Sequence, residues 1–135
     1  MTPDGMKRLP LTRGSDQYNE ARDAMMEIIK RWAAARRTDN YKALSAELAD
    51  EGFAVPYFSK LMSELLESAC REAHRSGAPG MLTAIVVNKT TGRPSPQFFN
   101  LAEQSPFCSQ DRPGWNWEAE RDLVFEHAHK TKAAD

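Results

Sequence analysis

The chain has 135 residues, of which 41% are hydrophobic and 27% are charged, and its formal net charge is -1. This length and balance are typical of one globular domain that buries a core without disulfide or metal cross-links. A charge so close to zero excludes strong long-range attraction to nucleic acid or membranes, so a charged binding face requires local clustering of charge.

The first fourteen residues contain two prolines and two glycines, and they predict a flexible arm. They lack the apolar core of a signal peptide, and no apolar run reaches the roughly 20 residues needed to span a bilayer. We therefore expect a cytoplasmic protein without a membrane partner, in which Cys70 and Cys108 stay reduced. The folded domain is expected over residues 15–130, with a flexible tail at 131–135.

A long amphipathic helix is expected to begin near Ser15. Apolar side chains recur there at steps of three and four residues, which gives one buried stripe. Arg36 and Arg37 lie near its basic end, where cations suit the negative end of the helix dipole. The stripe comprises Tyr18, Ala21, Met25, Ile28, Ile29 and Trp32.

Two further helices are predicted between positions 38 and 77. The segment Thr38–Asn40 supplies N-cap candidates for a short helix that Gly52 ends. Pro56 fits the first position of a third helix, and Gly77 fits its C-terminal cap. The buried face of this third helix is predicted to comprise Phe58, Leu61, Met62, Leu65, Ala69 and Ala73.

The clearest β signal follows these helices. The run Leu82–Val87 is apolar and rich in β-branched residues, and Asn88–Gly92 supplies residues typical of a turn. Because Pro94 and Pro96 disfavour a central strand, residues 97–102 fit either a helical turn or a returning strand.

A last helix is predicted from about Trp115 to His129, with Asn116 as its cap. Its acidic residues alternate with Arg121, which indicates a solvated face rather than a catalytic pair of carboxylates. These acidic residues are Glu118, Glu120, Asp122 and Glu126.

The order of a short helix, a tight link, a longer helix and a β-turn is that of a helix-turn-helix with a wing. We therefore expect a mainly α-helical single domain with a short β element (α+β), winged-helix-like, with additional N- and C-terminal helices. In detail, the helix led by Tyr41, the helix from Pro56 and the segment Pro79–Gly92 resemble the C-terminal half of alkylguanine DNA alkyltransferases and alkyltransferase-like proteins. The resemblance implies this fold and contact with bases or phosphates.

The resemblance covers about residues 41–93 and stops short of the family's chemistry. Where the family carries a Pro-Cys-His-Arg acceptor motif, this chain has Pro79–Leu82, with neither cysteine nor histidine. Alkyl transfer to a cysteine is therefore excluded. The family's arginine in the recognition helix also has no counterpart, since Lys60 is the nearest basic residue to the start of that helix.

The function expected first is that of a non-enzymatic nucleic-acid-binding accessory or regulatory protein, which contacts double-stranded DNA through its phosphates. Residues 78–100 hold two basic residues and no acidic one, whereas the helix from Pro56 balances its basic residues with acids. A carboxylate beside a basic residue offsets its contact with phosphate, so the turn is the better candidate. The predicted contacts are Arg36, Arg37, Tyr41, Lys60, Lys89 and Arg93.

The alternative is a protein-interaction module, with a foreign protein partner or as a homodimer, and the near-neutral charge favours it. Neighbouring aromatic residues cannot both face one core on a regular element, so one of each pair is a candidate surface anchor. The pairs are Phe98 with Phe99 and Trp115 with Trp117. A small enzyme of unrecognised type ranks third.

Signatures of catalysis and metal binding are weak. Cys70 and His74 lie four residues apart on a helix, and Cys108 with His127 or His129 would complete four zinc ligands, but the chain has no Cys-x-x-Cys pair. Buried or unassigned cysteines are the favoured interpretation, with Cys108 the more reactive candidate nucleophile. No glycine-rich phosphate loop is present. We therefore predict no catalytic residue, no metal and no cofactor.

Overall fold

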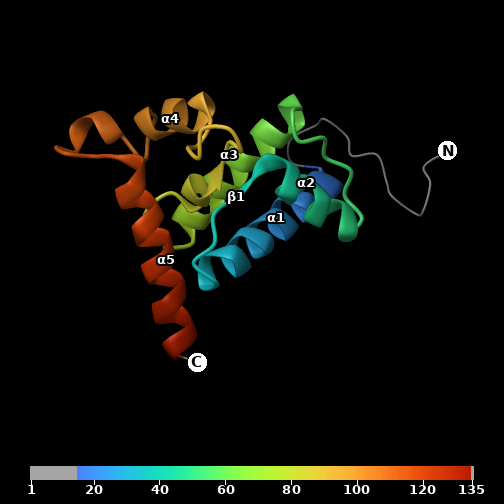
Figure 1. Ribbon diagram of the computed structural model, residues 1–135, viewed down its shortest axis with the longest axis horizontal. Coiled ribbons are helices and arrows are strands. Elements are labelled where there is room, and N and C mark those ends of the chain that lie inside the picture. The colour runs from blue at the N-terminus through green and yellow to red at the C-terminus, as the bar shows by residue number, and fades with distance from the viewer. Residues whose placement is uncertain (1–14, 135) are drawn as a thin grey trace.

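The structure is a computed structural model that describes residues 15–134 (Figure 1). These residues form one mainly helical domain with five α-helices, two 3-10 helices and a two-stranded parallel sheet. The predicted arm at residues 1–14 lies outside the described residues, as does residue 135. In chain order the elements are α1 (Asp16–Ala34), β1 (Asp39–Asn40), α2 (Tyr41–Asp50), α3 (Lys60–Arg75), η2 (Leu82–Ile85), β2 (Val86–Val87), α4 (Pro96–Glu103), η3 (Ser109–Asp111) and α5 (Trp117–Ala134).

Helices α1 and α3 pack against each other in the main hydrophobic core, and α2 and α5 cover them on different sides (Figure 1). Helix α1 begins after Ser15, whose Oγ accepts a hydrogen bond from the Tyr18 N–H at 3.2 Å. The predicted apolar stripe of α1 is confirmed, because all six of its members are at most 2% exposed. This long regular pattern anchors the fold.

Two predicted helix caps are confirmed. Asn40 Oδ1 accepts from the Ala43 N–H at 2.8 Å and starts α2, while Asn116 Oδ1 accepts from the Ala119 N–H at 2.8 Å and starts α5. Each amide satisfies a backbone donor that the first turn of a helix leaves open. Helix α5 continues to Ala134, beyond the predicted end at His129, and so overlaps the predicted tail. Within residues 15–134, none of the helices is both long and apolar enough to cross a membrane.

The start of α3 differs from the prediction. The helix begins at Lys60 instead of Pro56, because the Ser59 Oγ caps it by accepting from the Met62 N–H at 3.1 Å. Phe58 therefore precedes the helix and is 80% exposed, so its predicted place on the buried face is wrong. The other five residues predicted for that face are buried.

The predicted strand at Leu82–Val87 is also different. Its first four residues form the 3-10 helix η2, and only Val86 and Val87 form β2, which runs parallel to β1 with Asp39 opposite Val86. A wing is an antiparallel hairpin, and the pairing of β2 with β1 does not show one. Every residue from 82 to 87 is at most 7% exposed, and a short run buried on all sides lacks the periodicity that tells strand from helix. Of the two alternatives for residues 97–102, the helix is found, as α4.

A second hydrophobic cluster lies between α3, α4 and the start of α5. A buried carboxylate borders it: Glu120, which is 1% exposed, accepts from the Met81 N–H at 3.0 Å, from the Trp115 Nε1–H at 2.6 Å and from Arg112. The prediction that Glu120 belongs to a solvated face is therefore wrong, whereas Glu118, Asp122 and Glu126 are exposed as expected. The cluster comprises Cys70, Met81, Ala84, Val87, Phe98, Leu101, Ala102, Phe107 and Trp117.

Candidate functional site

A pocket of about 180 Å³ opens beside the first half of α3, and we call it the α3 pocket. Its walls come from the first residue of α2, the segment before α3, the α3 helix itself, and the chain from η2 through α4. The lining mixes aromatic and aliphatic side chains with hydroxyl and amide groups, which can fix the orientation of a ligand. Its polar members include Tyr41, Ser59, Ser63, Thr83, Asn88, Ser95 and Gln97.

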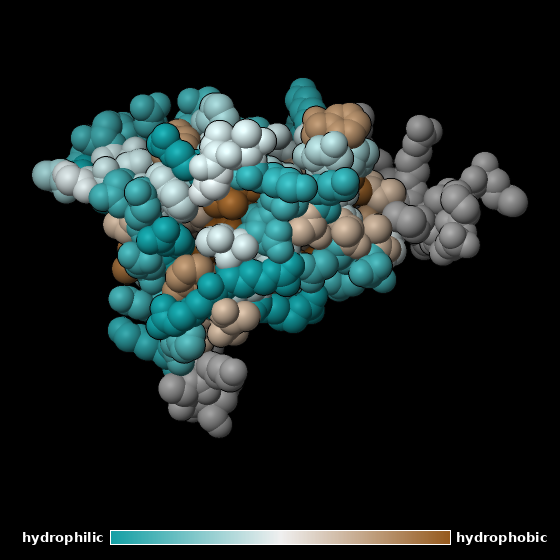
Figure 2. Space-filling view, viewed as in Figure 1, coloured by the Kyte–Doolittle hydropathy of each residue, from teal (hydrophilic) through white to brown (hydrophobic). Residues whose placement is uncertain are grey.

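Two aromatic residues stand at the mouth of this pocket. Tyr57 is 46% exposed and Phe58 is 80% exposed, and their rings pack edge to face with centroids 5.1 Å apart. Figure 2 shows hydrophobic atoms protruding above the segment that precedes α3, with hydrophilic atoms around them. A large apolar ring exposed to this degree beside a pocket is unusual for side chains that serve only to pack. The sequence signal for this pair was Ser59, since a cap there places both aromatics outside the helix.

One of the predicted nucleic-acid contacts lines the α3 pocket, and three others lie within two positions of its lining residues in the chain. Tyr41 lines it, and its hydroxyl accepts a hydrogen bond from the Ser95 N–H at 2.9 Å. Lys60 follows the lining residue Ser59, and its side chain is 89% exposed, with Glu64 at 3.9 Å. The other two, Lys89 and Arg93, lie in the turn between β2 and α4.

That turn is closed by main-chain hydrogen bonds. The Asn88 N–H donates to the Arg93 carbonyl oxygen at 2.7 Å, and the Gly92 N–H donates to the Asn88 carbonyl oxygen at 2.8 Å. Lys89 is exposed, and the guanidinium of Arg93 lies over the ring of Phe99 at 5.6 Å from its centroid. The turn therefore holds both cations at the surface, next to Asn88 of the pocket wall.

The other two predicted contacts, Arg36 and Arg37, lie apart from the pocket, at the corner between α1 and β1. Arg36 is exposed in a left-handed backbone conformation with φ of 51°. Arg37 is occupied within the protein: it donates to Asp39 Oδ2 from Nε at 2.9 Å, and its guanidinium lies over the Trp32 ring at 4.8 Å.

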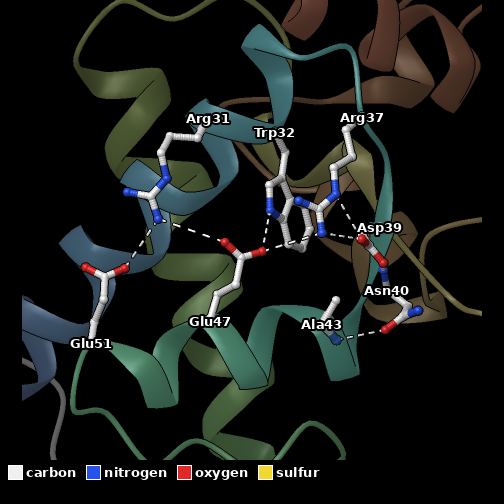
Figure 3. A network of polar contacts seen from close by, with 8 residues as sticks. All are labelled: Arg31, Trp32, Arg37, Asp39, Asn40, Ala43, Glu47 and Glu51. Carbon is white, nitrogen blue, oxygen red and sulfur yellow. Dashed lines mark hydrogen bonds and ion pairs between the residues drawn. The ribbon is translucent and has the colours of Figure 1, made fainter.

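Figure 3 shows that Glu47 links this corner to α1. One of its oxygens accepts from the Trp32 Nε1–H at 2.7 Å and lies 3.6 Å from Arg37, and the other lies 3.9 Å from Arg31. Arg31 also lies 3.5 Å from Glu51. The network brings two arginines to three carboxylates, so a phosphate would compete with acids already in place, and we assign the network a role in holding α2 against α1.

The network predicts a dependence of stability on pH. Burial acts to raise the pKa of Asp39, but hydrogen bonds from Arg37 and the Asn40 N–H, with the charge of Arg37, lower it below its ordinary value of 3.8. A depressed pKa in the folded state stabilises the protein above the unfolded value, and this contribution is lost as the pH falls through the folded pKa. Asp39→Asn should therefore destabilise the protein by less than about 1 kcal/mol at pH 6, and in urea denaturation the difference should shrink as the pH is lowered below the ordinary value of 3.8. A difference that stays constant with pH would contradict this account.

The four predicted interaction aromatics serve mainly in packing. Phe98 and Trp117 are 6% and 8% exposed in the second cluster, so they are not surface anchors. Phe99 and Trp115 are half-buried against that cluster, with ring centroids 6.4 Å apart. The exposed aromatic pair of this protein is instead Tyr57 and Phe58.

The candidate zinc and cysteine residues are not brought together. Cys70 is fully buried, and burial raises the pKa of its thiol to about 11, with a further contribution from the charge of Glu120, so the thiol stays protonated at neutral pH. His74 packs edge to face on Phe107, with centroids 5.2 Å apart, and Cys108 lies in the loop before η3. Within residues 15–134, no group of three or more His, Cys, Asp or Glu side chains has the arrangement of a metal site.

The α3 pocket, with its aromatic mouth and nearby cations, is the candidate functional site of this chain. No protein-family model, curated protein or solved structure matches the chain.

Proposed function

We propose that this protein binds nucleic acid without catalysing a reaction, and that it binds a single strand across the mouth of the α3 pocket. The observation that carries the proposal is that Phe58, a lining residue of the α3 pocket, is 80% exposed. Tyr41 also lines this pocket, and the cations Lys60, Lys89 and Arg93 lie within two positions of lining residues in the chain. Proteins that bind single strands combine aromatic rings, on which bases stack, with cations that follow the backbone.

The aromatic pair supplies the apolar part of this interaction. Every base has a flat π-face, so an exposed ring accepts stacking from any sequence. The edge-to-face packing of Tyr57 on Phe58 restrains the Phe58 ring, which reduces the entropy lost on binding. Phe58 is therefore suited to hold one base at the pocket mouth.

The cations supply the contacts to phosphate. Lys60 and Lys89 project from the segments that wall the pocket, and the stretch from 78 to 100 that carries Lys89 and Arg93 contains no acidic residue. Lys60 is paired with Glu64 at 3.9 Å, and an exposed ion pair of this length is weak enough to yield to phosphate. Two or three phosphate contacts are within reach of this face.

The composition of α3 favours a single strand over a duplex. Beyond Lys60 the helix carries Glu64, Glu67 and Glu72, and the last two are paired with Arg71 and Arg75. A helix with this charge balance is poorly suited to lie between the two phosphate rows of a groove. A winged-helix mode of duplex binding remains the alternative arrangement, and the experiment below includes it.

Titration of fluorescently labelled single-stranded DNA, single-stranded RNA and duplex DNA, followed by anisotropy, tests the proposal. Phe58→Ala should weaken single-strand binding about 5- to 150-fold, because stacking contributes about 1–3 kcal/mol per base. Leu123→Ala is the matched control, because it removes an exposed apolar side chain from α5, and it should leave the affinity unchanged.

The dependence of affinity on salt separates phosphate contact from other binding. With two or three phosphate contacts, the logarithm of the affinity should fall with the logarithm of the salt concentration with a slope of about -1.4 to -2.1. Lys89→Ala should reduce the magnitude of this slope by about 0.7. Lys130→Ala on α5 is the control and should leave the slope unchanged. Absence of binding to all three nucleic acids at low salt would overturn the proposal and leave Phe58 as an anchor for a protein. Stronger binding to duplex would overturn the single-strand mode alone.

A further inference from the structure

A second and larger cavity, of about 360 Å³, lies where the C-terminal halves of α1 and α5 meet the end of α3. We infer that this α1/α5 cavity binds an aliphatic carboxylate, with the hydrocarbon chain inside and the carboxylate at the mouth. None of its lining residues also lines the α3 pocket, so the inference does not depend on the proposed function.

The cavity exists because small side chains face one another. Ala33 and Ala34 of α1 and Ala73 of α3 lie opposite Val124 and Ala128 of α5. An alanine pair leaves space between helices that leucine would fill, and packed interiors rarely contain a void of this size. The walls are therefore aliphatic on three sides.

The chain after α3 closes the remaining side. Ala78, Pro79 and Leu82 border the cavity as the chain passes from α3 toward η2, and Leu82 is 6% exposed. Figure 1 shows the end of α1 and the second half of α5 approaching each other toward the lower end of the molecule, and both segments supply lining residues. Small-molecule sites are typically clefts of about 300–1,000 Å³ with mainly apolar walls and a few polar groups, and this cavity falls within that range.

The charges at the cavity point to an anion. Its ionisable lining residues are Lys30 and His127, and no described lining residue is an aspartate or glutamate. Lys30 is about half-exposed, and the carboxylate of Glu27 lies 3.7 Å away in a surface pair of the kind that contributes little. The carboxylate of a ligand can therefore form an ion pair with the Lys30 ammonium group. Its hydrocarbon chain would at the same time displace water from the alanine-lined walls. A neutral ligand with a chain of equal length would gain only the burial of that chain.

Titration with decanoate and with decanol, kept below their aggregation limits and followed by calorimetry and by amide chemical shifts, tests this inference. Decanoate should bind at one site with a Kd of about 0.01–1 mM, a range set by the small size of the ligand. Decanol should bind more weakly. Lys30→Gln should weaken decanoate about three- to tenfold and leave decanol unchanged.

A variant that fills the cavity supplies the decisive comparison. Ala34→Leu places extra methyl groups in the cavity from a half-buried position of α1 and should abolish binding of both ligands. Ala49→Leu, at a half-buried position of α2 outside the cavity, should not. If Ala34→Leu fails to fold by circular dichroism, Ala128→Leu replaces it.

Three results would overturn the inference: no saturable binding of decanoate, equal affinities for decanoate and decanol, or equal effects of the cavity-filling and control variants. Shifts confined to amides near the α3 pocket would also overturn it, because the ligand would then occupy the other site.

Discussion

Replacing Glu120 by alanine is expected to lower the free energy of unfolding by about 3 kcal/mol, the largest effect of any single substitution considered for this chain. The carboxylate is 1% exposed and accepts from the Met81 N–H, the Trp115 indole and Arg112. Its removal leaves the buried Met81 N–H without its acceptor. Arg112 is 44% exposed and can return to water, which keeps the cost at the lower end for a broken buried pair. Urea denaturation with linear extrapolation measures the change.

Glu118→Ala is the matched control for this substitution, since Glu118 lies in the same first turn of α5 and is exposed. We expect it to change stability by less than about 0.5 kcal/mol. The loss of stability for Glu120→Gln should fall between these two losses. An amide keeps one acceptor oxygen, but its NH2 group faces groups that are themselves donors. Equal losses for Glu120→Ala and Glu118→Ala would show that the buried carboxylate does not hold α5 in place.

Gly80→Ala is expected to lower the free energy of unfolding by about 2–3 kcal/mol, because Gly80 lies close to Glu120. Gly80 has a φ of 75°, a left-handed conformation that a residue with a Cβ adopts at a cost of about 1–2 kcal/mol. A Cβ there would also lie 2.8 Å from Glu120 Oε2 and 3.1 Å from Leu123 Cβ. The carboxylate would have to move away from the Met81 N–H, so strain and a lost hydrogen bond add. Thermal and urea unfolding measure the sum.

Gly92→Ala separates the two contributions to this cost. Gly92 has a φ of 70°, but nothing lies within 4 Å of the place its Cβ would occupy. Its substitution should therefore cost only the backbone part, about 1 kcal/mol. If Gly80→Ala and Gly92→Ala destabilise the protein equally, the contact of the added Cβ with Glu120 contributes nothing to the cost of Gly80→Ala.

Local patterns in the sequence predicted the elements that local forces decide. The stripe of α1 repeats for about four turns, and the caps Asn40 and Asn116 each act on a backbone group three residues away. Such signals need no knowledge of the rest of the fold. They correctly gave a mainly helical domain with a long first helix.

Features decided by distant contacts were not predictable in the same way. Leu82–Ile85 forms a 3-10 helix although its composition favours a strand, and burial on all sides leaves no periodicity in the sequence that distinguishes the two. Glu120 looks like its exposed neighbours in the sequence, and only Met81, 39 positions away, gives it a buried partner. Phe58 was misplaced by one competing signal, since Pro56 and Ser59 both suit a helix start.

Most residues of the α3 pocket could not be predicted from the sequence. Of the residues predicted for nucleic-acid contact, Tyr41 lines the pocket, while Lys60, Lys89 and Arg93 lie within two positions of lining residues in the chain. Arg37 is predicted from its charge alone, but it is already paired with Asp39, two positions later, and with Glu47, which the packing of α2 on α1 brings near. Charge counts along a sequence do not show which charges are already neutralised.

The parallel pairing of β1 with β2 has a consequence for how the chain folds. Asp39 meets Val86 across 47 positions of sequence (86 minus 39), so the pair closes a long loop for very few hydrogen bonds. The entropy of closing that loop is not repaid by two residues of ladder, so the pair cannot nucleate folding. It forms only after α2 and α3, which lie inside the loop, have packed on α1. We therefore expect the sheet to form late in folding, and its formation to depend on the correct packing of the helices.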